Sequence, residues 1–459
     1  MVIGSLVPAP RLLWFVGLAG VPAATLIGAG PGWAVPASLV VLVIAVAASA
    51  DAWIGWPSLA GAVVEAPPVV HGSRGGELDL VVAVRGLGAG AVAGLSLPDS
   101  IQCARPCVHL SAPDDTARWR LRVLKRGRHC FDRLYLQAAT PLGLWHRRRA
   151  VALGTEVHVF PDMRRDRAGV AAVFLDRGGS GRHSRPQVGK GREFDHLRDY
   201  TAGDDFGDIH WKSTARRGFP VTKMFQIERT REVYAVIDHS RLSARPVQSI
   251  EIGETGAGDG DGPMTGGNTL VVTRCERMLE SALAIGMAAE RQHDRFGLVT
   301  FADQVTQCVR SGAGRAHFGL CRNALLSLEP RLVAPDFEEL FVFLRRHITR
   351  RSLVILFTDL SDPLQAESFV RDARLISRQH VVIVCMIRPE RAAPLFSRTS
   401  VDSVDDLYAE LGGHLLWHDL QEVAAVLGRQ GVHVSFPDSS ALSVEAVSRY
   451  MEVKNRQLL

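Results

Sequence analysis

Two aspartates lie at the ends of apolar runs that are typical of buried strands, where α/β proteins often bind ligands. Asp238 ends the apolar run VYAVID, and Asp359 follows the apolar run SLVILFT of Ser352–Thr358. Both runs have the continuous apolar character of strands that are buried on both faces. Because open parallel sheets bind ligands beyond the carboxyl ends of their strands, Asp238, the nearby Ser240 and Asp359 are candidate site residues.

The segment Gly189–Gly218 holds a second group of candidate residues, a mixture of charged, aromatic and apolar side chains. Its candidate partner-binding residues are Glu193, Arg198, Tyr200, Asp204, His210, Trp211, Lys212 and Arg216. Acidic and basic residues nearly balance, which does not favour nucleic-acid binding. Two interpretations stay open: an intramolecular ion-pair network packed under Trp211, and a recognition surface or ligand pocket.

The order of motifs in this segment resembles a known family. Gly-x-Gly-x-Glu-Phe is followed by Leu-Arg-x-Tyr, Gly-Asp, Ile-x-Trp-Lys and Ala-Arg, and then by the strand that ends at Asp238. This order is similar to that of the domain of unknown function 58 family of bacterial and archaeal membrane-associated proteins. One departure is Gly207, a position where members often carry arginine.

The resemblance implies that residues 233–459 form a von Willebrand factor type A-like α/β domain with a doubly wound sheet. In such domains Asp-x-Ser-x-Ser and Thr-Asp loops, with a threonine from another loop, hold Mg²⁺ through oxygen ligands. Asp238, Ser240 and Asp359, with Thr358, match this pattern. Leu242 replaces the second serine, and the loop 311–317, where the threonine is expected, has none. We therefore expect a degenerate Mg²⁺ site, or an Asp238 that caps a turn or pairs with an arginine.

Alternating short apolar runs and longer amphipathic ones support this α/β organisation independently. The expected strands include Phe296–Ala302, Ser352–Thr358 and His380–Ile387; the expected helices are Thr269–His293, Phe337–Ile348 and Leu364–Gln379. This alternation predicts a mainly parallel sheet with helices on both sides. The insertion 244–268, rich in Gly and Asp, is expected to be a mobile loop near the metal edge.

Residues 57–165 are expected to form a small all-β sandwich or barrel. In the segment WRLRVLKRG, Trp119, Leu121 and Val123 alternate with polar residues, which is the period of a half-buried strand. Residues 166–232 then carry the family motifs into the α/β domain. No residue of the β module suggests catalysis.

Residues 1–56 are expected to form a two-helix membrane hairpin. Leu12–Ala50 contains no charged residue and is broken by Gly30-Pro31-Gly32, which predicts helices of about 12–29 and 33–50 that each cross a bilayer. The connecting turn carries no Lys or Arg, which favours both chain ends, and the bulk of the chain, in the cytoplasm. A cleaved signal peptide followed by a stop-transfer helix is the alternative.

Composition and motif searches exclude several classes of protein. The formal charge of +5 on 459 residues is mild, and the seven cysteines are scattered, as in reduced cytoplasmic proteins. Lys190 lies in no complete phosphate-binding loop, and neither a Gly-x-Ser-x-Gly nor a His-Glu-x-x-His motif occurs. We therefore do not expect an enzyme.

The expected function is that of a membrane-anchored protein-binding adaptor. The family resemblance implies a MoxR-type AAA+ ATPase as partner, in the assembly or maturation of other proteins or of envelope complexes. Other membrane or envelope proteins, and the lipid bilayer around the hairpin, complete the expected contacts. The alternative is a structural scaffold of the cell envelope whose α/β domain needs no metal.

Overall fold

The computed structural model divides into two compact units, each described by itself below. The first comprises residues 1–162 with 251–270, and the second residues 163–250 with 271–459. Within them the structure describes residues 4–29, 31–55, 59, 61–86, 90–110, 116–163, 169–174, 193–226, 231–251, 269–395, 397 and 403–456.

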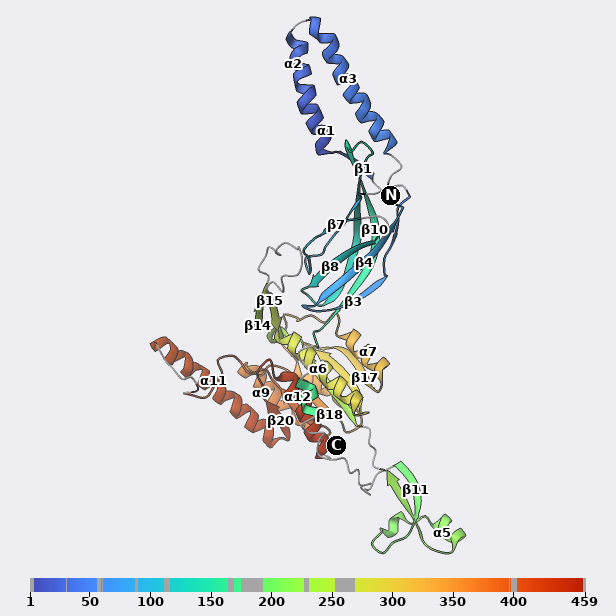
Figure 1. Ribbon diagram of the computed structural model, residues 1–459. Helices are drawn as coiled ribbons and strands as arrows, with labels where there is room; N and C mark the ends of the chain where they lie inside the picture. Colours follow the sequence, from blue (N-terminus) through green and yellow to red (C-terminus); the bar gives the residue numbers. More distant parts are fainter. Residues whose placement is uncertain are drawn as a thin grey trace. The chain divides into compact units, whose positions relative to one another are not determined.

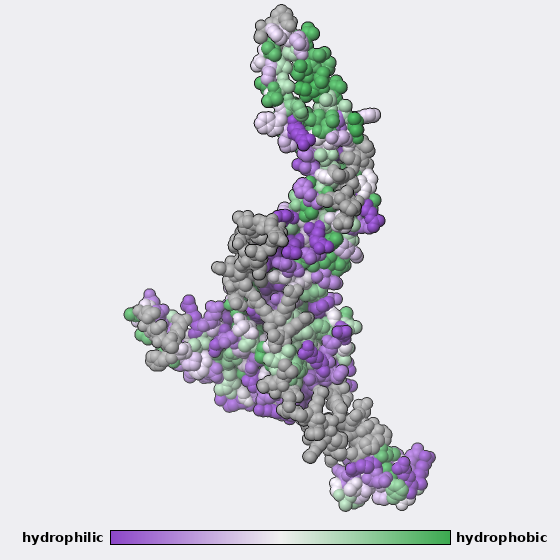
Figure 2. Space-filling view, in the orientation of Figure 1, coloured by the Kyte–Doolittle hydropathy of each residue, from purple (hydrophilic) through white to green (hydrophobic). Residues whose placement is uncertain are grey.

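The first unit opens with a short strand and two apolar helical segments. Strand β1 (Gly4–Pro8) leads into α1 (Pro10–Phe15), the π-helical turn η1 (Val16–Gly20) and α2 (Val21–Ala29); α3 (Pro31–Ile54) then runs back beside α2 (Figure 1). Residues 35–54 are long and apolar enough to cross a membrane, and only 11% of an 18-residue stretch within them is buried. Residues 10–26 form a shorter apolar helix. In Figure 2 hydrophobic residues (green) predominate on α3, and the other segment shows green residues mixed with paler ones.

Most of the rest of the first unit consists of two packed sheets, whose strand pairs are antiparallel except for the parallel pair of β3 and β10. One has the order β1-β10-β9-β5-β7 with β3 beside β10, and the other the order β2-β4-β8-β6. The strands are β2 (Val63–Glu65), β3 (Val69–Ser73), β4 (Glu77–Arg85), β5 (Val92–Leu95), β6 (Ile101–Cys103), β7 (Cys107–His109), β8 (Thr116–Val123), β9 (Gly127–Ala139) and β10 (Trp145–Phe160). Their inward side chains form one core, in which Trp119, Leu121 and Val123 are buried as their alternation predicts.

The pairing of β1 with β10 is a feature that the sequence did not suggest. The two strands are antiparallel, with Gly4 opposite Arg149 and Pro8 opposite Trp145. The chain therefore enters the apolar helices from an edge of the sheet and returns to the same sheet after them.

The α/β part of the second unit is built on a six-stranded sheet of order β17-β16-β13-β18-β19-β20. Its strands are β13 (Glu232–Asp238), β16 (Arg295–Phe301), β17 (Val305–Gly312), β18 (Leu353–Phe357), β19 (Val381–Cys385) and β20 (Val432–Ser435). All neighbouring pairs are parallel except β16 with β17. The expected strands are therefore present, and β17 forms an antiparallel edge.

Helices pack on both faces of this sheet. Side chains of β13 alternate between two cores: Val233 and Ile237 lie with α6 (Arg274–Arg291) and α12 (Leu442–Asn455), and Val236 lies with the other helices. That second face is covered by α8 (Phe337–His347), α9 (Pro363–Asp372), α10 (Arg374–Ser377) and α11 (Val404–Arg429); α7 (Arg315–Ala324) packs beside α6.

Two expected helices differ from those observed. The helix expected from Thr269 begins at Arg274, because 269–273 is the strand β15 and Thr273 caps the helix through its side chain. The helix expected over 364–379 is divided into α9 and α10 around Ala373. In the insertion, Pro246–Glu251 is the strand β14, paired with β15, and residues 252–268 lie outside the described residues.

The motif segment forms a small module of its own, residues 193–226. Strands β11 (Glu193–Asp199) and β12 (Val221–Gln226) form an antiparallel pair. Between them lie the 3₁₀ turn η2 (Phe206–Asp208) and the helix α5 (Trp211–Arg217). The helix ends at Gly218, whose φ of 79° is left-handed and suits glycine. We call these residues the motif module.

Candidate functional site

Asp238 and Asp359 lie at the same edge of the sheet, as expected from the sequence. Strands β13 and β18 are parallel neighbours, so their carboxyl ends meet. Both carboxylates are 1% exposed. The charge of Asp359 is close enough to help raise the pKa of Asp238, although burial is the main cause of that rise. The edge thus holds two carboxyl groups in a desolvated environment.

Each oxygen of Asp238 accepts a hydrogen bond from within the chain. Oδ1 accepts from the backbone N–H of Ser240 at 2.8 Å, and Oδ2 accepts from the Thr358 hydroxyl at 2.6 Å. Asp238 therefore caps its own turn, which is one of the two alternatives for this residue. These bonds favour the charged form but do not outweigh the effect of burial on the pKa.

Asp359 is neutralised by an arginine that sequence reasoning missed. Arg274, the first residue of α6, donates from its guanidinium to Oδ2 of Asp359 in a buried ion pair, while Oδ1 accepts from the N–H of Ser361 at 2.9 Å. The Arg274 side chain is 10% exposed. The positive charge at this edge is therefore supplied by the protein itself.

The serine loop offers few oxygen atoms to a ligand. The Ser240 hydroxyl makes no well-oriented hydrogen bond to a described residue, although it lies close enough to Asp238 to lower that group's pKa. Leu242, at the position of the second serine, is 3% exposed and belongs to the turn Arg241–Ala244, which packs on α6. The Ser243 hydroxyl donates to the carbonyl of Ser240 at 2.7 Å and is used within the turn.

The loop 311–317 lies at the opposite end of the sheet from the aspartates. In the antiparallel pair of β16 and β17, Gly312 is opposite Phe296, at the amino end of β16. The expectation that this loop borders the metal edge is therefore wrong, because an antiparallel edge strand reverses direction. The segment beside the Asp238 loop is residues 329–336: its Arg331 N–H donates to the carbonyl of His239, and the N–H of Arg241 donates to the carbonyl of Val333. This segment also lacks threonine.

These contacts do not fit a bound Mg²⁺. A divalent cation of this kind needs several free oxygen ligands. Here the carboxylates of Asp238 and Asp359 are already hydrogen-bonded, and Arg274 holds Asp359. Across the described parts of the chain, no group of three or more His, Cys, Asp or Glu side chains is placed to hold a metal.

In the motif module, the structure brings Arg198 and Asp204 together. Arg198 donates to both oxygens of Asp204 at 2.7 and 3.0 Å, and Asp204 also accepts from the N–H of Thr201 at 2.9 Å. The backbone hydrogen bond from Thr201, followed by the side chain of Arg198, lowers the pKa of Asp204. The Tyr200 ring lies 5.9 Å from the ring of Phe206. This cluster fixes the loop between β11 and η2.

His210 begins α5 and has a structural role. Its Nδ1 accepts hydrogen bonds from the N–H of Ser213 at 3.2 Å and from the Ser213 hydroxyl at 2.7 Å, so the ring caps the helix. Trp211 is 67% exposed, so among the described residues it lies on the surface, and the ion-pair network expected to be packed under it is not seen there. Lys212 and Arg216 are exposed beside it on the same helix. Glu193 is a residue of β11, and its side chain lies outside the described residues.

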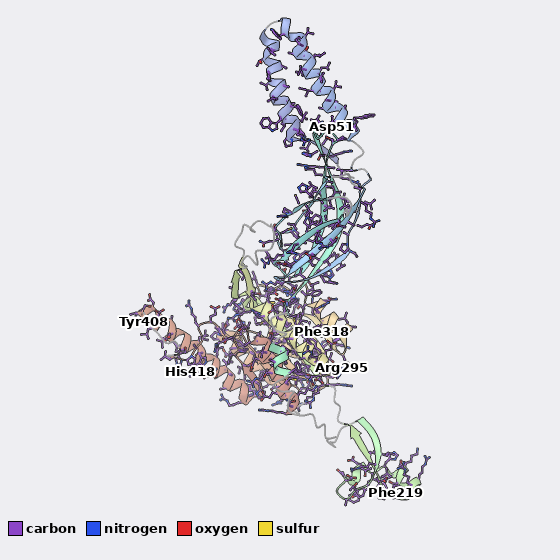
Figure 3. All side chains as sticks on the ribbon, in the orientation of Figure 1. Asp51, Phe219, Arg295, Phe318, Tyr408 and His418 are labelled. Atoms are coloured by element: carbon purple, nitrogen blue, oxygen red, sulfur yellow. The ribbon has the colours of Figure 1, made fainter. Side chains whose placement is uncertain are left out.

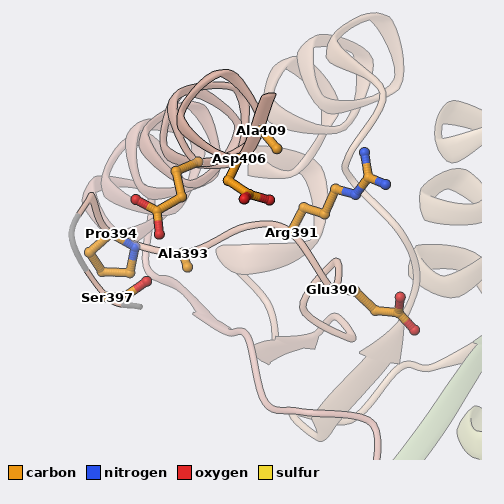
Figure 4. A pocket seen from close by; sticks show the side chains of 8 residues that line it. Glu390, Arg391, Ala393, Pro394, Ser397, Asp406 and Ala409 are labelled. Atoms are coloured by element: carbon orange, nitrogen blue, oxygen red, sulfur yellow. The ribbon is translucent and has the colours of Figure 1, made fainter. Parts of the chain in front are cut away.

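A small pocket of about 210 Å³ lies between α11 and the segment after β19 (Figure 4). Glu390, Arg391 and Pro394 line one side, and Asp406 and Ala409, on α11, line the other. The pocket is more acidic than basic. None of its residues was a candidate in the sequence.

The comparisons with known proteins identify the family. Residues 196–248 and 264–406 match the family model described as "Protein of unknown function DUF58". The chain therefore contains a DUF58 region in its C-terminal part. The match begins inside the motif module and continues through both aspartates of the sheet edge, so the DUF58 region contains nearly all the candidate residues. No curated protein matches this DUF58 chain.

Three solved structures are similar to this chain at low identity. The conserved hypothetical protein BatB from Bacteroides thetaiotaomicron has 14% identity and a TM-score of 0.31, over 49% of this chain and 99% of that one. Proximal thread matrix protein 1 from the mussel byssus has 11% identity and a TM-score of 0.23, over 48% of this chain and 46% of that one. An uncharacterized membrane spanning protein from Vibrio fischeri has 16% identity and a TM-score of 0.17, over 49% of this chain and 98% of that one. Because these scores are low, the fold described above rests on strand order and core packing alone.

Proposed function

We propose that this DUF58 protein is a membrane-anchored adaptor that binds other proteins. Its partner in this proposal is a MoxR-type AAA+ ATPase, and the pair acts in the assembly or maturation of other proteins or envelope complexes. The role is one of binding and not of catalysis. The observation that carries the proposal is the exposed aromatic surface of the motif module.

Three large aromatic side chains of this module face solvent. Phe206 is 73% exposed, Trp211 67% and Phe219 44%, and Phe219 is labelled in Figure 3. Aromatic residues supply most of the binding free energy at many protein interfaces, and exposed apolar groups of this size mark contact surfaces. The Arg198–Asp204 pair and the His210 cap hold the backbone that carries them. The module therefore presents a preorganised surface, which lowers the entropy cost of binding.

The topology of the first unit supports a membrane hairpin with two crossings. Strand β1 precedes the apolar helices and β10 follows them, yet the two strands pair. A single crossing would leave these strands on opposite sides of the bilayer. The helical run from Pro10 to Ala29 is about 30 Å long at about 1.5 Å per residue, close to the roughly 30 Å of the hydrocarbon core. Both chain ends and both units are cytoplasmic in this proposal.

In this proposal the α/β domain is von Willebrand factor type A-like, and the Arg274 guanidinium takes the place of the metal ion at the strand ends. The ion pair between Arg274 and Asp359 supports a binding edge that needs no Mg²⁺. Removing the arginine would free Asp359 for a metal. We therefore expect Mg²⁺ to raise the melting temperature of the Arg274→Met variant and to leave that of the wild type unchanged. An equal rise in both would restore Mg²⁺ as a ligand of the native site.

The proposal is tested by purifying the detergent-solubilised protein from its native membranes and identifying what co-purifies. A MoxR-type ATPase retained in the presence of chelator supports the adaptor and the metal-free edge. Retention only with Mg²⁺ would support the adaptor with a working metal site. Envelope proteins without an ATPase would instead favour the structural scaffold.

Variants locate the contact surface in the same experiment. The double variant Phe206→Ser/Trp211→Ser should lose most of the ATPase while keeping its melting temperature, since both side chains are exposed. Tyr408→Ser is the matched control, because Tyr408 is 69% exposed on α11, outside the motif module. Asp238→Ala tests the strand-end edge: a folded variant with unchanged binding would remove that edge from the interface.

A further inference from the structure

The edge of the α/β sheet opposite the two aspartates contains an open cavity of about 570 Å³. Four arginines and a histidine line it: Arg295, Arg310, Arg346, Arg350 and His347. Glu232 is the one acidic residue in its lining. This cavity shares no residue with the sites described above.

The arginine and histidine side chains come from separate elements and converge on one space. Arg295 is the first residue of β16, and Arg310 lies near the end of the antiparallel strand β17, so both are at the amino edge of the sheet. Arg346 and His347 are the last residues of α8, and Arg350 lies in the turn before β18. The reversal of β17 thus brings Arg310 to this edge.

Two of the four cavity arginines, Arg310 and Arg346, have no carboxylate partner among the described residues. Several arginines elsewhere in the domain have a carboxylate partner, such as Arg331 with Asp303 and Arg388 with Asp438. Arg295 approaches Glu232 only to 3.9 Å and donates to the carbonyl of Ser311 at 2.9 Å. A concave surface with an excess of positive charge concentrates anions.

A buried tyrosine adds a polar group to the lining. Tyr234 is 4% exposed, and its hydroxyl oxygen accepts from the N–H of Ser311 at 3.1 Å. The hydroxyl proton remains available to a ligand, since no described residue accepts a hydrogen bond from it. Gly297 on the neighbouring strand makes room for the ring, because a Cβ at this position would overlap the Tyr234 ring. The sheet is thus shaped to hold this phenol at the cavity.

We propose that this cavity binds a ligand carrying several phosphate charges. The guanidinium group presents its N–H donors in a planar fork that matches phosphate oxygens, and several such groups around one space suit a compact polyvalent anion. The volume is in the range of small-molecule sites. Arg310 and Arg346 are the main ligand-binding cations, and the Tyr234 hydroxyl donates to the anion.

Isothermal titration of the full-length protein with inorganic pyrophosphate tests the proposal. The wild type is expected to bind pyrophosphate. In the double variant Arg310→Gln/Arg346→Gln we expect the Kd for pyrophosphate to rise at least about tenfold, a loss of about 1.4 kcal/mol of binding free energy. Arg429→Gln on α11 is the matched control, because it removes an exposed arginine outside the cavity, and it should change the Kd less than about twofold. Melting temperatures establish that all variants are folded.

The lipid composition of the preparation separates two sources of the phosphate groups. In nanodiscs that contain cardiolipin, a headgroup in the cavity would weaken pyrophosphate binding to the wild type compared with nanodiscs of phosphatidylcholine alone. Equal affinity in both preparations would indicate a soluble phosphate ligand. The proposal is overturned if the wild type does not bind pyrophosphate, if the double variant binds it as the wild type does, or if poly-glutamate binds in its place.

Discussion

At the scale of single residues, the ion pair between Arg274 and Asp359 decides the character of the strand-end edge. The Asp359 carboxylate is buried, so removing its partner leaves an uncompensated charge in a desolvated place. We expect Arg274→Met to lower the free energy of unfolding by about 3 kcal/mol, as measured by urea unfolding of the full chain in detergent. Adding Asp359→Asn should recover most of this loss.

The control for this experiment is Arg331→Met. Arg331 pairs with Asp303 at 2.6 Å, but both side chains are more than two-fifths exposed, at 41% and 44%. Exposed pairs contribute about 0 to 1 kcal/mol. Equal losses from Arg274→Met and Arg331→Met would contradict the role assigned to the buried pair.

Asp238 makes the stability of the folded protein depend on pH. Burial raises its pKa, so the folded protein keeps the proton to a higher pH than the unfolded chain does. Its contribution to stability is therefore largest below about pH 4, near the unfolded pKa, and is lost as the pH rises through the folded pKa. Each tenfold difference in proton affinity corresponds to about 1.4 kcal/mol.

Asp238→Asn removes this titration and keeps an oxygen to accept from Ser240. Relative to the wild type, the variant should gain stability as the pH rises from about 4 towards neutrality, as measured by urea unfolding at several pH values. Parallel pH profiles for the two proteins would show that Asp238 has an ordinary pKa.

At the scale of elements, Asp51 joins the apolar helix α3 to the β sandwich. It is 0% exposed, and its carboxylate accepts from the Thr140 hydroxyl at 2.5 Å and from the N–H groups of Leu142 and Leu144 at 2.8 and 3.1 Å (Asp51 is labelled in Figure 3). The indole N–H of Trp145 donates to the carbonyl of Ala48 at 2.9 Å. The turn 140–145 is therefore held by the end of the helix.

Asp51→Ala should destabilise this junction. The three donors would lose their acceptor in a buried place, and each unsatisfied group costs about 1 to 3 kcal/mol. We expect a loss of about 3 kcal/mol, and faster proteolysis between residues 140 and 145. Asp51→Asn should lose less, because one oxygen remains.

Asp79→Ala is the control for the junction. Its carboxylate lies on β4, is 54% exposed and comes only within 3.9 Å of Arg120. Its loss should change stability by less than about 0.5 kcal/mol. A junction variant as mild as this control would mean that the helix and the sandwich are held together by other contacts.

The elements also show which parts of the structure follow from local sequence. The alternation around Trp119 and the apolar run before Asp238 predict their strands, because burial on one face or on both leaves a direct mark. Arg274 was missed because its partner Asp359 is 85 residues away, and a single arginine at a helix start carries no local signal. The position of loop 311–317 was wrong because the direction of an edge strand is set by its pairing. Asp51 had a signal, a lone charge at the end of an apolar run, but its partners lie 89 to 93 residues further on.

At the scale of the whole molecule, the domain order follows from composition, since apolar, alternating and mixed α/β patterns succeed one another along the chain. The pairing of β1 with β10 does not follow from composition, because a strand of five residues is too short for its hydrophobic pattern to indicate which strand it pairs with. For the membrane anchor proposed above, this pairing constrains the topology. Two strands of one sheet lie on one side of a bilayer, so the proposed anchor crosses it an even number of times.

Labelling with a membrane-impermeant maleimide tests this topology. Cys130 on β9 and Cys308 on β17 are exposed free thiols, one in each unit. Single-cysteine proteins that keep one of them, and a third with a cysteine tag before Met1, should all stay unlabelled in intact cells and react in inverted membrane vesicles. An even crossing number places all three on one side, and the proposal makes that side the cytoplasm. Labelling of all three in intact cells would keep the hairpin and reverse its orientation. A tag that reacts from one side while Cys130 reacts from the other would mean a single crossing, and would be incompatible with the pairing of β1 and β10.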